Sequence, residues 1–303
     1  MAGQTRIPVI LDTDIGGDID DTWSLAMLLK HPGLEPRLVV GDTGDTAYRG
    51  ALIAKFLERS GRTEIPVGIG AGDERPLPKR QTGWVGDYTS ADYPGTVHED
   101  GVQAIIDTIR VSETPVAVVC IGPVPNVALA LQRAPDIAGN AHFVGMHGSI
   151  HMGHNRNPVP VAETNVVRNP RALGEVLAAP WLSKTITPLD TCGIVRVGGE
   201  NYQRLFERPD DPVLTALFEN YRCWAAVHEA VRVNPDEMSS ILYDTVAVHL
   251  AASREFLTVV PMALRVTEDG FTVPDPEGPV VDVALDWTDR PGFHRHLVDV
   301  LVG

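Results

Sequence analysis

Five aspartates fall within ten residues near the start of this chain: Asp12, Asp14, Asp18, Asp20 and Asp21. They stand between the strand-like apolar run 7–11 and the helical pattern 22–30. Carboxylates held this close repel one another, and some take up protons unless a cation neutralises them. The run offers only oxygen ligands, which favours Ca²⁺ or Mg²⁺ over zinc or copper. The aspartates therefore predict a site for a hard divalent cation.

Other roles are open to these aspartates. Asp20 or Asp21 suits the N-terminus of the helix that follows, although capping requires only one carboxylate. An EF-hand does not fit, because Trp23 stands where the bidentate glutamate belongs and a strand precedes the run. Asp12 and Asp14 have the spacing of a phosphate-transferring D-x-D loop. A metal-dependent phosphohydrolase is therefore the alternative function.

The run DTDIGGDIDD (12–21) resembles the opening motif of the inosine–uridine-preferring nucleoside hydrolase family, DTDPGxDD, with Gly17 and Asp18 as two additional residues. The resemblance continues from residue 9 to about residue 250, in the order of the family. The segments that carry it are IPVGIGAGDERPL (65–77), HEDG (98–101), IGPVPNVALAL (121–131), AETN (162–165) and Tyr243-Asp244.

This resemblance implies an N-ribosyl hydrolase that cleaves a ribonucleoside into ribose and free base with the help of Ca²⁺. It implies that the carboxylates of Asp14, Asp21 and Asp244 and the backbone carbonyl of Ile121 hold the metal. Asp14 is then the candidate general base for the attacking water. A pocket dense in carboxylates stabilises an oxocarbenium-like transition state more than it stabilises a neutral substrate.

The resemblance also implies that Asp20, Asn157, Glu163 and Asn165 contact the substrate. Asp45 is a further candidate, since the run GDTAYRGALIAKFL (44–57) is similar to a GDTxxR segment of one bacterial subgroup. Two of these residues have a simpler structural explanation. Asn165 could cap a loop, and Asp45 could cap the helix expected over 46–60.

The chain departs from the family at the position before the last metal-binding aspartate. Many members have a histidine there that helps to protonate the leaving base, whereas this chain has Tyr243. His228 and Trp224 are four residues apart on an expected helix, so both can face one pocket. Tyr243 and His228 are therefore the candidates for the leaving group, and Trp224 for the substrate. The substitution also leaves open a protein that binds ribonucleosides without hydrolysing them.

Four histidines, His142, His147, His151 and His154, suggest a zinc site as a further hypothesis. The spacing of His147 and His151 suits a helix, but the neighbouring glycines at 145, 148 and 153 predict a strand that passes into a loop. No third nitrogen or sulfur ligand is recognisable, so we favour calcium over zinc.

Short apolar runs alternate with helical patterns through the first half of the chain. The strand-like runs are 7–11, 37–40, 65–69, 115–121 and 141–144, and the helical patterns cover 22–30, 46–60, 101–111 and 126–133. This alternation predicts an α/β, Rossmann-like fold with a mainly parallel central sheet flanked by helices. Further on, we expect a strand at 185–187, helices at 213–231, from 244 and at 293–301, and a β-rich tail over 256–286. We expect a single domain over 1–303, with a less regular C-terminal cap and a small β extension.

Composition restricts the partners of this chain. A formal net charge of −15 over 303 residues argues against nucleic acid, because binding to phosphates requires clustered Lys and Arg. No segment approaches the ~20 apolar residues of a membrane span. Three cysteines without a C-x-x-C pair fit a reducing compartment, which predicts a cytoplasmic protein. The resemblance further implies a small nucleoside substrate and a homodimer or homotetramer.

Overall fold

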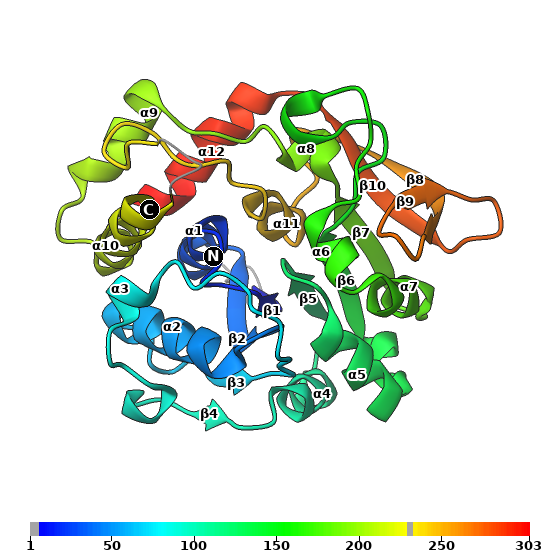
Figure 1. Ribbon diagram of the computed structural model, residues 1–303, viewed down its shortest axis with the longest axis horizontal. Coiled ribbons are helices and arrows are strands. Elements are labelled where there is room, and N and C mark those ends of the chain that lie inside the picture. Colours follow the sequence, from blue (N-terminus) through cyan, green and yellow to red (C-terminus); the bar gives the residue numbers. More distant parts are fainter. Residues whose placement is uncertain (1–5, 229–232) are drawn as a thin grey trace, which may run out of the picture.

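A single ten-stranded sheet forms the centre of the computed structural model, which describes residues 6–228 and 233–303. Its strand order is β4-β3-β2-β1-β5-β6-β7-β10-β8-β9, and Figure 1 shows β4 and β9 at opposite ends of the molecule. The strands are β1 (Ile7–Thr13), β2 (Leu34–Gly41), β3 (Val67–Ile69), β4 (Val97–His98), β5 (Val116–Cys120), β6 (Ala141–Met146), β7 (Ser183–Thr187), β8 (Leu257–Val266), β9 (Thr272–Pro274) and β10 (Val280–Trp287).

The direction of the strands creates a ligand-binding edge. All pairs from β4 to β10 are parallel, whereas β8 runs antiparallel to β10 and β9. The chain leaves β1 towards β2, β3 and β4 and returns to β5 on the other side of β1. This topology places a switch point between the carboxyl ends of β1 and β5, where open parallel sheets bind ligands. The predicted α/β, mainly parallel fold is thus confirmed.

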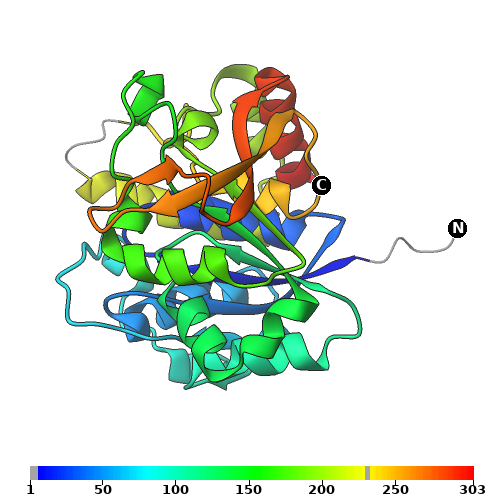
Figure 2. The same ribbon diagram turned by 90° about the vertical axis from the view of Figure 1, so that its right-hand side faces the viewer.

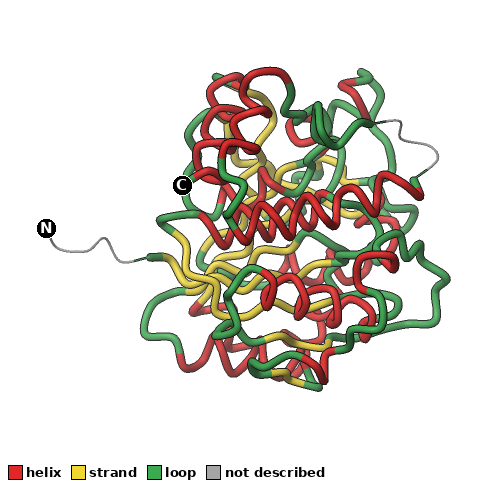
Figure 3. The backbone as a smooth tube through the Cα atoms, turned by 90° about the vertical axis from the view of Figure 1, so that its left-hand side faces the viewer, coloured by secondary structure: helices red, strands yellow, loops and turns green. Residues whose placement is uncertain are grey.

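Helices lie on both faces of the sheet, and Figure 3 shows the strands running between them. The longer helices are α1 (Asp20–Lys30), α2 (Thr46–Arg59), α4 (Gly101–Val111), α5 (Pro125–Arg133), α7 (Pro170–Ala178), α10 (Pro212–Val227) and α12 (Arg290–Val302). The short ones are α3 (Thr82–Val85), α6 (Thr164–Arg168), α8 (Leu189–Cys192), α9 (Gly199–Gln203) and α11 (Thr245–Leu250), with 3₁₀ turns at Ser90–Asp92, Pro135–Asn140, His154–Arg156 and Arg204–Glu207.

The central strands pack on two hydrophobic clusters. Successive side chains of a strand point to opposite faces, so Val9 and Leu11 of β1 join the cluster that contains α1 and α2, whereas Ile10 joins the cluster with α4 and α5. Every residue of β5 is buried, as the continuous apolar run 116–121 predicts for a central strand. This packing holds the ends of β1 and β5 in place on both sides.

The β-rich tail predicted over 256–286 is present as β8, β9 and β10. Strand β10 pairs in parallel with β7, so the tail extends the main sheet. Figure 2 shows this tail and α12, in orange to red, at the opposite end of the molecule from the cyan and teal elements. Helix α10 ends at Val227, and residues 229–231 of the expected helix lie outside the described residues. Within 6–228 and 233–303, no helix combines the length and the apolar character that a bilayer crossing requires.

Candidate active site

A cavity of about 360 Å³ opens at the switch point, beside the carboxyl ends of β1 and β5. This size falls in the range of small-molecule sites, about 300–1,000 Å³. Predicted metal-site residues line it, namely Asp14, Asp21, Ile121 and Asp244. Predicted substrate and leaving-group residues line it as well, namely Asp20, Glu163, Asn165, His228 and Tyr243. The cavity therefore brings together side chains from both halves of the chain.

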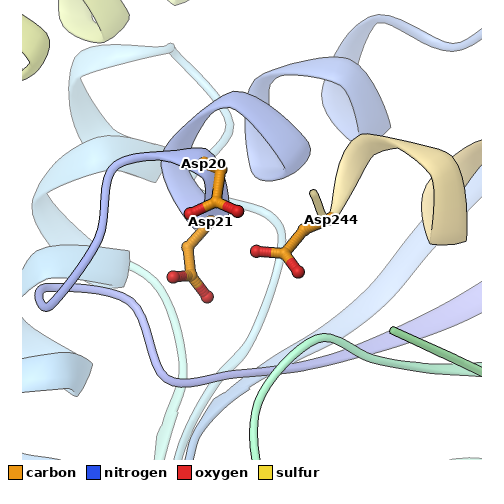
Figure 4. A group of neighbouring side chains, drawn as sticks. All are labelled: Asp20, Asp21 and Asp244. Atoms are coloured by element: carbon orange, nitrogen blue, oxygen red, sulfur yellow. The ribbon is translucent and has the colours of Figure 1, made fainter. Parts of the chain in front are cut away.

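Three carboxylates from opposite ends of the chain converge on one side of the cavity. Asp20 and Asp21 form the first turn of α1, and Asp244 occupies the N-cap position of α11. One carboxylate oxygen of each lies within 4.8 Å of the others, and Figure 4 shows Asp244 directed towards Asp20 and Asp21. All three residues are buried. This arrangement is what a shared cation would require.

The electrostatics of these carboxylates also favour a cation. Burial raises the pKa of Asp20, Asp21 and Asp244 well above the ordinary value, and the neighbouring carboxylates raise it further. The Thr13 hydroxyl donates to Asp21 Oδ1 at 2.5 Å, and this bond and the charge of Arg49 offset the rise in the Asp21 pKa only in part. Since all the donors are carboxylate oxygens, the cluster fits Ca²⁺ or Mg²⁺ and does not fit a soft metal.

Asp14 lies near this cluster, but its carboxylate is paired with arginine. Its carboxylate oxygen Oδ2 forms an ion pair with Arg168 and lies 3.9 Å from Arg49 Nη2. The predicted metal ligands were Asp14, Asp21, Asp244 and the Ile121 carbonyl. Among the described residues, the group of carboxylates close enough to share an ion contains Asp20 in place of Asp14. The Ile121 carbonyl accepts a hydrogen bond from Asn165 Nδ2 at 3.0 Å.

Glu163 and Asn165 are polar residues of the cavity lining at the start of α6. Glu163 is the N-cap of α6 and accepts hydrogen bonds from the backbone N–H groups of Asn165 and Val166 at 2.8 and 3.3 Å, and from that of Gly148 at 3.2 Å. Burial raises the pKa of Glu163 to about 7, against the opposing effect of these hydrogen bonds. Both side chains line the cavity, so the capping role and a role in the site coexist.

The additional residues Gly17 and Asp18 form a loop whose backbone carbonyls accept hydrogen bonds from side chains. The Gly17 carbonyl accepts from Trp224 Nε1 at 3.3 Å and from Arg80 Nη1 at 3.2 Å, and the Asp18 carbonyl accepts from Gln81 Nε2 at 2.8 Å. Gly16 has φ +111°, and a Cβ there would lie 2.5 Å from the ring of Tyr48. The loop therefore requires glycine at 16 and presents Asp18 to the cavity.

Aromatic and histidine side chains complete the cavity. Tyr243 lies edge-on to His154, with the ring centroids 6.2 Å apart, and burial raises the pKa of its hydroxyl. His228 caps the C-terminus of α10 and lies 4.6 Å from the ring of Trp224. Trp224 itself is fully buried beneath the cavity and does not line it. The predicted pair therefore divides into a lining residue, His228, and a supporting residue, Trp224.

Two predicted substrate residues lie outside the cavity lining. Asp45 caps α2 by accepting from the Tyr48 N–H at 3.0 Å, and it pairs with Lys79 in an adjacent hollow of about 250 Å³. Asn157 is exposed, and its carbonyl accepts from the Gly153 N–H at 2.8 Å within the loop that follows β6. The capping explanation is thus the one that the geometry supports for Asp45.

The histidines after β5 do not form a zinc site. His142 contacts Ser183 Oγ at 2.8 Å, and the buried His147 contacts the Gly122 carbonyl at 3.0 Å. His151 is exposed, whereas His154 lines the cavity. In the described part of the chain these four side chains contribute to no group of ligands that could share a metal.

Some residues in and around the site were not predicted from the sequence. Arg80 and Arg168 line the cavity, and Arg168 follows the AETN segment by three residues, one helical turn from Asn165. Asp42 is fully buried and does not line the cavity, but it lies close to Asp14. Burial raises the pKa of Asp42 well above the ordinary value, and the charges of Asp12 and Asp14 raise it further. Its position at the carboxyl end of β2 was the available signal, because that end lies on the same sheet edge as Asp14.

Two bacterial ribonucleoside hydrolases are similar to this chain over nearly its whole length. The chain is 28% identical over 316 residues to a non-specific ribonucleoside hydrolase, RihC, of Klebsiella pneumoniae, with 98% of each chain covered. It is 26% identical to a pyrimidine-specific ribonucleoside hydrolase, RihA, of Escherichia coli, over 97% of this chain and 98% of the relative.

Solved structures share the fold. A plant nucleoside hydrolase superposes with a TM-score of 0.79 at 22% identity, covering 98% of this chain and 99% of the other. The inosine-uridine preferring nucleoside hydrolase of Bacillus anthracis gives a TM-score of 0.75 at 19% identity, with 98% and 99% coverage. The family model described as inosine-uridine preferring nucleoside hydrolase matches residues 9–295. This chain therefore belongs to the inosine-uridine preferring nucleoside hydrolase family, whose members are N-glycosyl hydrolases.

Proposed function

We propose that this enzyme hydrolyses the N-glycosidic bond of a ribonucleoside to ribose and free base, with Ca²⁺ as its metal. The observation that carries the proposal is the convergence of Asp20, Asp21 and Asp244 within 4.8 Å beside a cavity of about 360 Å³. Oxygen-only donors of this charge suit calcium, which accepts several carboxylates in flexible geometry. When bound, the ion supplies a positive charge that orients a water and the ribose hydroxyls and partly acidifies that water.

Asp14 is the proposed general base, supported by its place at the end of β1 and its carboxylate in the cavity wall. Its role would be to accept a proton from the water that attacks the anomeric carbon. The reacting sugar gains positive charge as the base leaves. Because that charge develops beside several buried carboxylates, the cavity would stabilise the transition state more than the neutral nucleoside.

Glu163 and Asn165 are proposed to orient the ribose. The three backbone N–H groups that bind the Glu163 carboxylate fix its orientation, and the Asn165 amide is held by the Ile121 and Met146 carbonyls. Side chains held in this way need little reordering when a sugar binds, which favours a defined pose. Asp20 serves the proposed metal and can contact a ribose hydroxyl from the same place.

Tyr243 and His228 are proposed as the residues that meet the leaving base. Both line the cavity, and burial raises the pKa of the Tyr243 hydroxyl, so this group stays a hydrogen-bond donor but is a weak acid. A departing base that gains negative charge is stabilised by such a hydrogen bond. Tyr243 stands where the family frequently has a histidine, and its proposed role is to stabilise the leaving base through a hydrogen bond.

The alternative of a phosphohydrolase has less support in the geometry. In a D-x-D phosphotransfer loop the first aspartate must reach the phosphorus, but Asp12 is fully buried. Its carboxylate accepts from Asn126 Nδ2 at 2.7 Å beneath the cavity. The position of Asp12 therefore favours the glycosidase.

One substrate panel tests the proposal. The purified protein, stripped with a chelator and reloaded with Ca²⁺ or Mg²⁺, is incubated with purine and pyrimidine ribonucleosides and with their 5′-monophosphates. We expect free ribose from nucleosides, greatest with Ca²⁺. Release of inorganic phosphate would support the phosphohydrolase, and saturable binding without ribose would support the binding protein.

We also propose, from the family resemblance, a homodimer or homotetramer in the cytoplasm. The described cysteines are free thiols, with Cys120 and Cys192 buried and Cys223 half-buried, which is compatible with a reducing compartment. Light scattering coupled to size-exclusion chromatography measures the oligomeric state directly. A monomer at micromolar concentration would contradict this part of the proposal.

A further inference from the structure

Arg168 places a positive charge against the carboxylate that is proposed to act as general base. It is the last residue of the short helix α6, and its Nη1 donates to Asp14 Oδ2. The Asp14 side chain is 11% exposed, and that of Arg168 is 24% exposed and lines the cavity. The ion pair therefore lies at the boundary between the protein interior and the space that a substrate and its metal would enter.

We propose that Arg168 is a resident counter-ion of Asp14 that competes with the divalent cation for this carboxylate and so sets the metal affinity of the site. Arg168 Nη1 donates to Asp14 Oδ2, so a cation that uses this carboxylate must compete with the guanidinium for it. Arg168 is thus a positioning residue that acts through Asp14. The inference rests on the proposed metal site, but it does not depend on which nucleoside is hydrolysed.

A second arginine beside Asp14 serves a different purpose. Arg49 is buried, and its guanidinium donates to the backbone carbonyls of Thr43, Asp14 and Ile15. These bonds fix the turn that follows β1, and breaking them would leave buried carbonyls unpaired. Arg49 is therefore a permanent part of the turn, and its Nη2 remains 3.9 Å from Asp14 Oδ2.

The Arg168 guanidinium can leave Asp14 and bind water instead. The backbone of Arg168 is anchored, since the Arg168 carbonyl accepts from Arg75 Nη1 at 2.6 Å. Its guanidinium, in contrast, is partly exposed and borders the cavity, where water can satisfy the N–H groups that leave Asp14. The side chain can therefore move away while α6, with Glu163 and Asn165 at its start, stays in place.

Charge explains why Arg168 and the ion would compete. The Asp20, Asp21 and Asp244 oxygens already attract a cation, and Asp14 adjoins them in the same cavity. A divalent ion and a guanidinium that share one carboxylate repel each other by about 1–2 kcal/mol at separations of roughly 6 Å in a mostly aqueous environment. Removing the guanidinium relieves this repulsion, and about tenfold tighter metal binding follows.

Direct metal binding to the full-length protein tests the inference without turnover. Calorimetric titration of chelator-stripped protein with CaCl₂ compares the wild type with Arg168→Met and Arg168→Lys. We expect the Met variant to bind Ca²⁺ about tenfold more tightly and the Lys variant, which keeps the charge, to remain close to the wild type. Arg171→Met is the matched control, because Arg171 lies three residues away in α7 and is exposed beside Glu175.

A second measurement, of thermal unfolding, shows whether each variant is folded and whether Ca²⁺ stabilises it. The melting temperature of each protein is recorded with and without 5 mM CaCl₂, and we expect the Ca²⁺-induced increase to be about 2–4 °C larger for Arg168→Met. If Arg168→Met does not fold, Arg168→Gln replaces it. Unchanged or weaker Ca²⁺ binding by a folded variant overturns the inference, as does a wild type that binds no Ca²⁺.

The outcome is independent of the proposed reaction. If the wild type releases no ribose but Arg168→Met binds Ca²⁺ more tightly, the proposed function fails and the inference holds. If ribose is released and the affinities are equal, the proposed function holds and the inference fails.

Discussion

The indole N–H of Trp224 donates to the carbonyl of Gly17 at 3.3 Å and so joins helix α10 to the loop that carries the two additional residues. The side chain of Trp224 is fully buried and packs on Tyr221, with ring centroids 5.8 Å apart. This contact supports a role for Trp224 as a tether of the loop rather than as the predicted contact with the substrate. It also explains how a longer loop keeps Asp18 and Asp20 at the cavity.

Replacing Trp224 with Phe tests that tether. The ring packing is largely kept and one hydrogen bond is lost, so we expect the free energy of unfolding to fall by about 1 kcal/mol. Urea denaturation measures it. Trp181→Phe is the control, since Trp181 Nε1 donates to the Val176 carbonyl at 2.8 Å away from the cavity. Unchanged stability with a more than tenfold higher KM would instead support direct contact with the substrate.

The fold was largely predictable because its signals are local. Apolar runs of strand length alternate with one-sided helical patterns up to residue 146, and the observed ends differ by only a few residues. Helix α1 begins at Asp20 rather than at residue 22, with Ile19 as its N-cap and no side-chain cap. The short helices α6, α8 and α9 were not predicted, since so few residues show no periodicity and tertiary contacts decide their conformation.

The residues of the site that belong to a recognisable sequence motif could be predicted. Asp14, Asp21 and Asp244 were assigned from the family resemblance, and they do line one cavity. The ion pair of Asp14 with Arg168 joins residues 154 positions apart, and no sequence pattern predicts this contact. Asn157 was assigned from the family resemblance and Trp224 from its helical spacing to His228. Whether such side chains are exposed or buried depends on how the loops and α10 fold back on the sheet.

Replacing Asp20 with Asn tests whether this residue binds the metal. Its carboxylate lies with Asp21 and Asp244 rather than apart from them, so we expect Asp20→Asn to weaken Ca²⁺ binding more than tenfold. Calorimetry measures this affinity, and ribose release should fall in parallel. Asp136→Asn, on an exposed carboxylate paired with Arg110, serves as the control. Full Ca²⁺ affinity with a raised KM would assign Asp20 to ribose alone.

Replacing Asp45 with Ala distinguishes a role in capping α2 from a role in substrate binding. As the N-cap of α2 it accepts from the Tyr48 N–H, so Asp45→Ala should reduce the free energy of unfolding by about 1 kcal/mol. Because Asp45 lies outside the cavity lining, we expect kcat/KM to stay within about twofold. Asp100→Ala is a close match, since Asp100 caps α4 and pairs with Arg133. A loss of activity at Asp45 alone would favour the predicted substrate contact.

His249 should make the protein sensitive to acid. It is almost fully buried, its Nε2 contacts the Glu255 carbonyl at 2.9 Å, and its Nδ1 has no partner within 6–228 and 233–303. Burial lowers the pKa of His249 from 6.5 to about 4; the Glu255 carbonyl opposes this shift, and the ring of His296, 5.1 Å away, contributes to it. A folded-state pKa below the unfolded value means that the folded protein binds fewer protons. The contribution to stability is therefore complete above pH 6.5 and is lost as the pH falls towards 4.

The shift in the pKa of His249 corresponds to a loss of about 3 kcal/mol in the free energy of unfolding as the pH falls from 6.5 to 4. Buried carboxyls with raised pKa, such as Asp12 and Asp42, act in the opposite direction, so the informative quantity is the difference between wild type and His249→Gln at each pH. Urea denaturation from pH 4 to 8 should show this difference shrinking as the pH falls, because glutamine keeps a donor for the Glu255 carbonyl and cannot be protonated. His151→Gln, on an exposed histidine, should follow the wild type throughout. Parallel curves for His249→Gln and the wild type would show that protonation of His249 does not destabilise the fold.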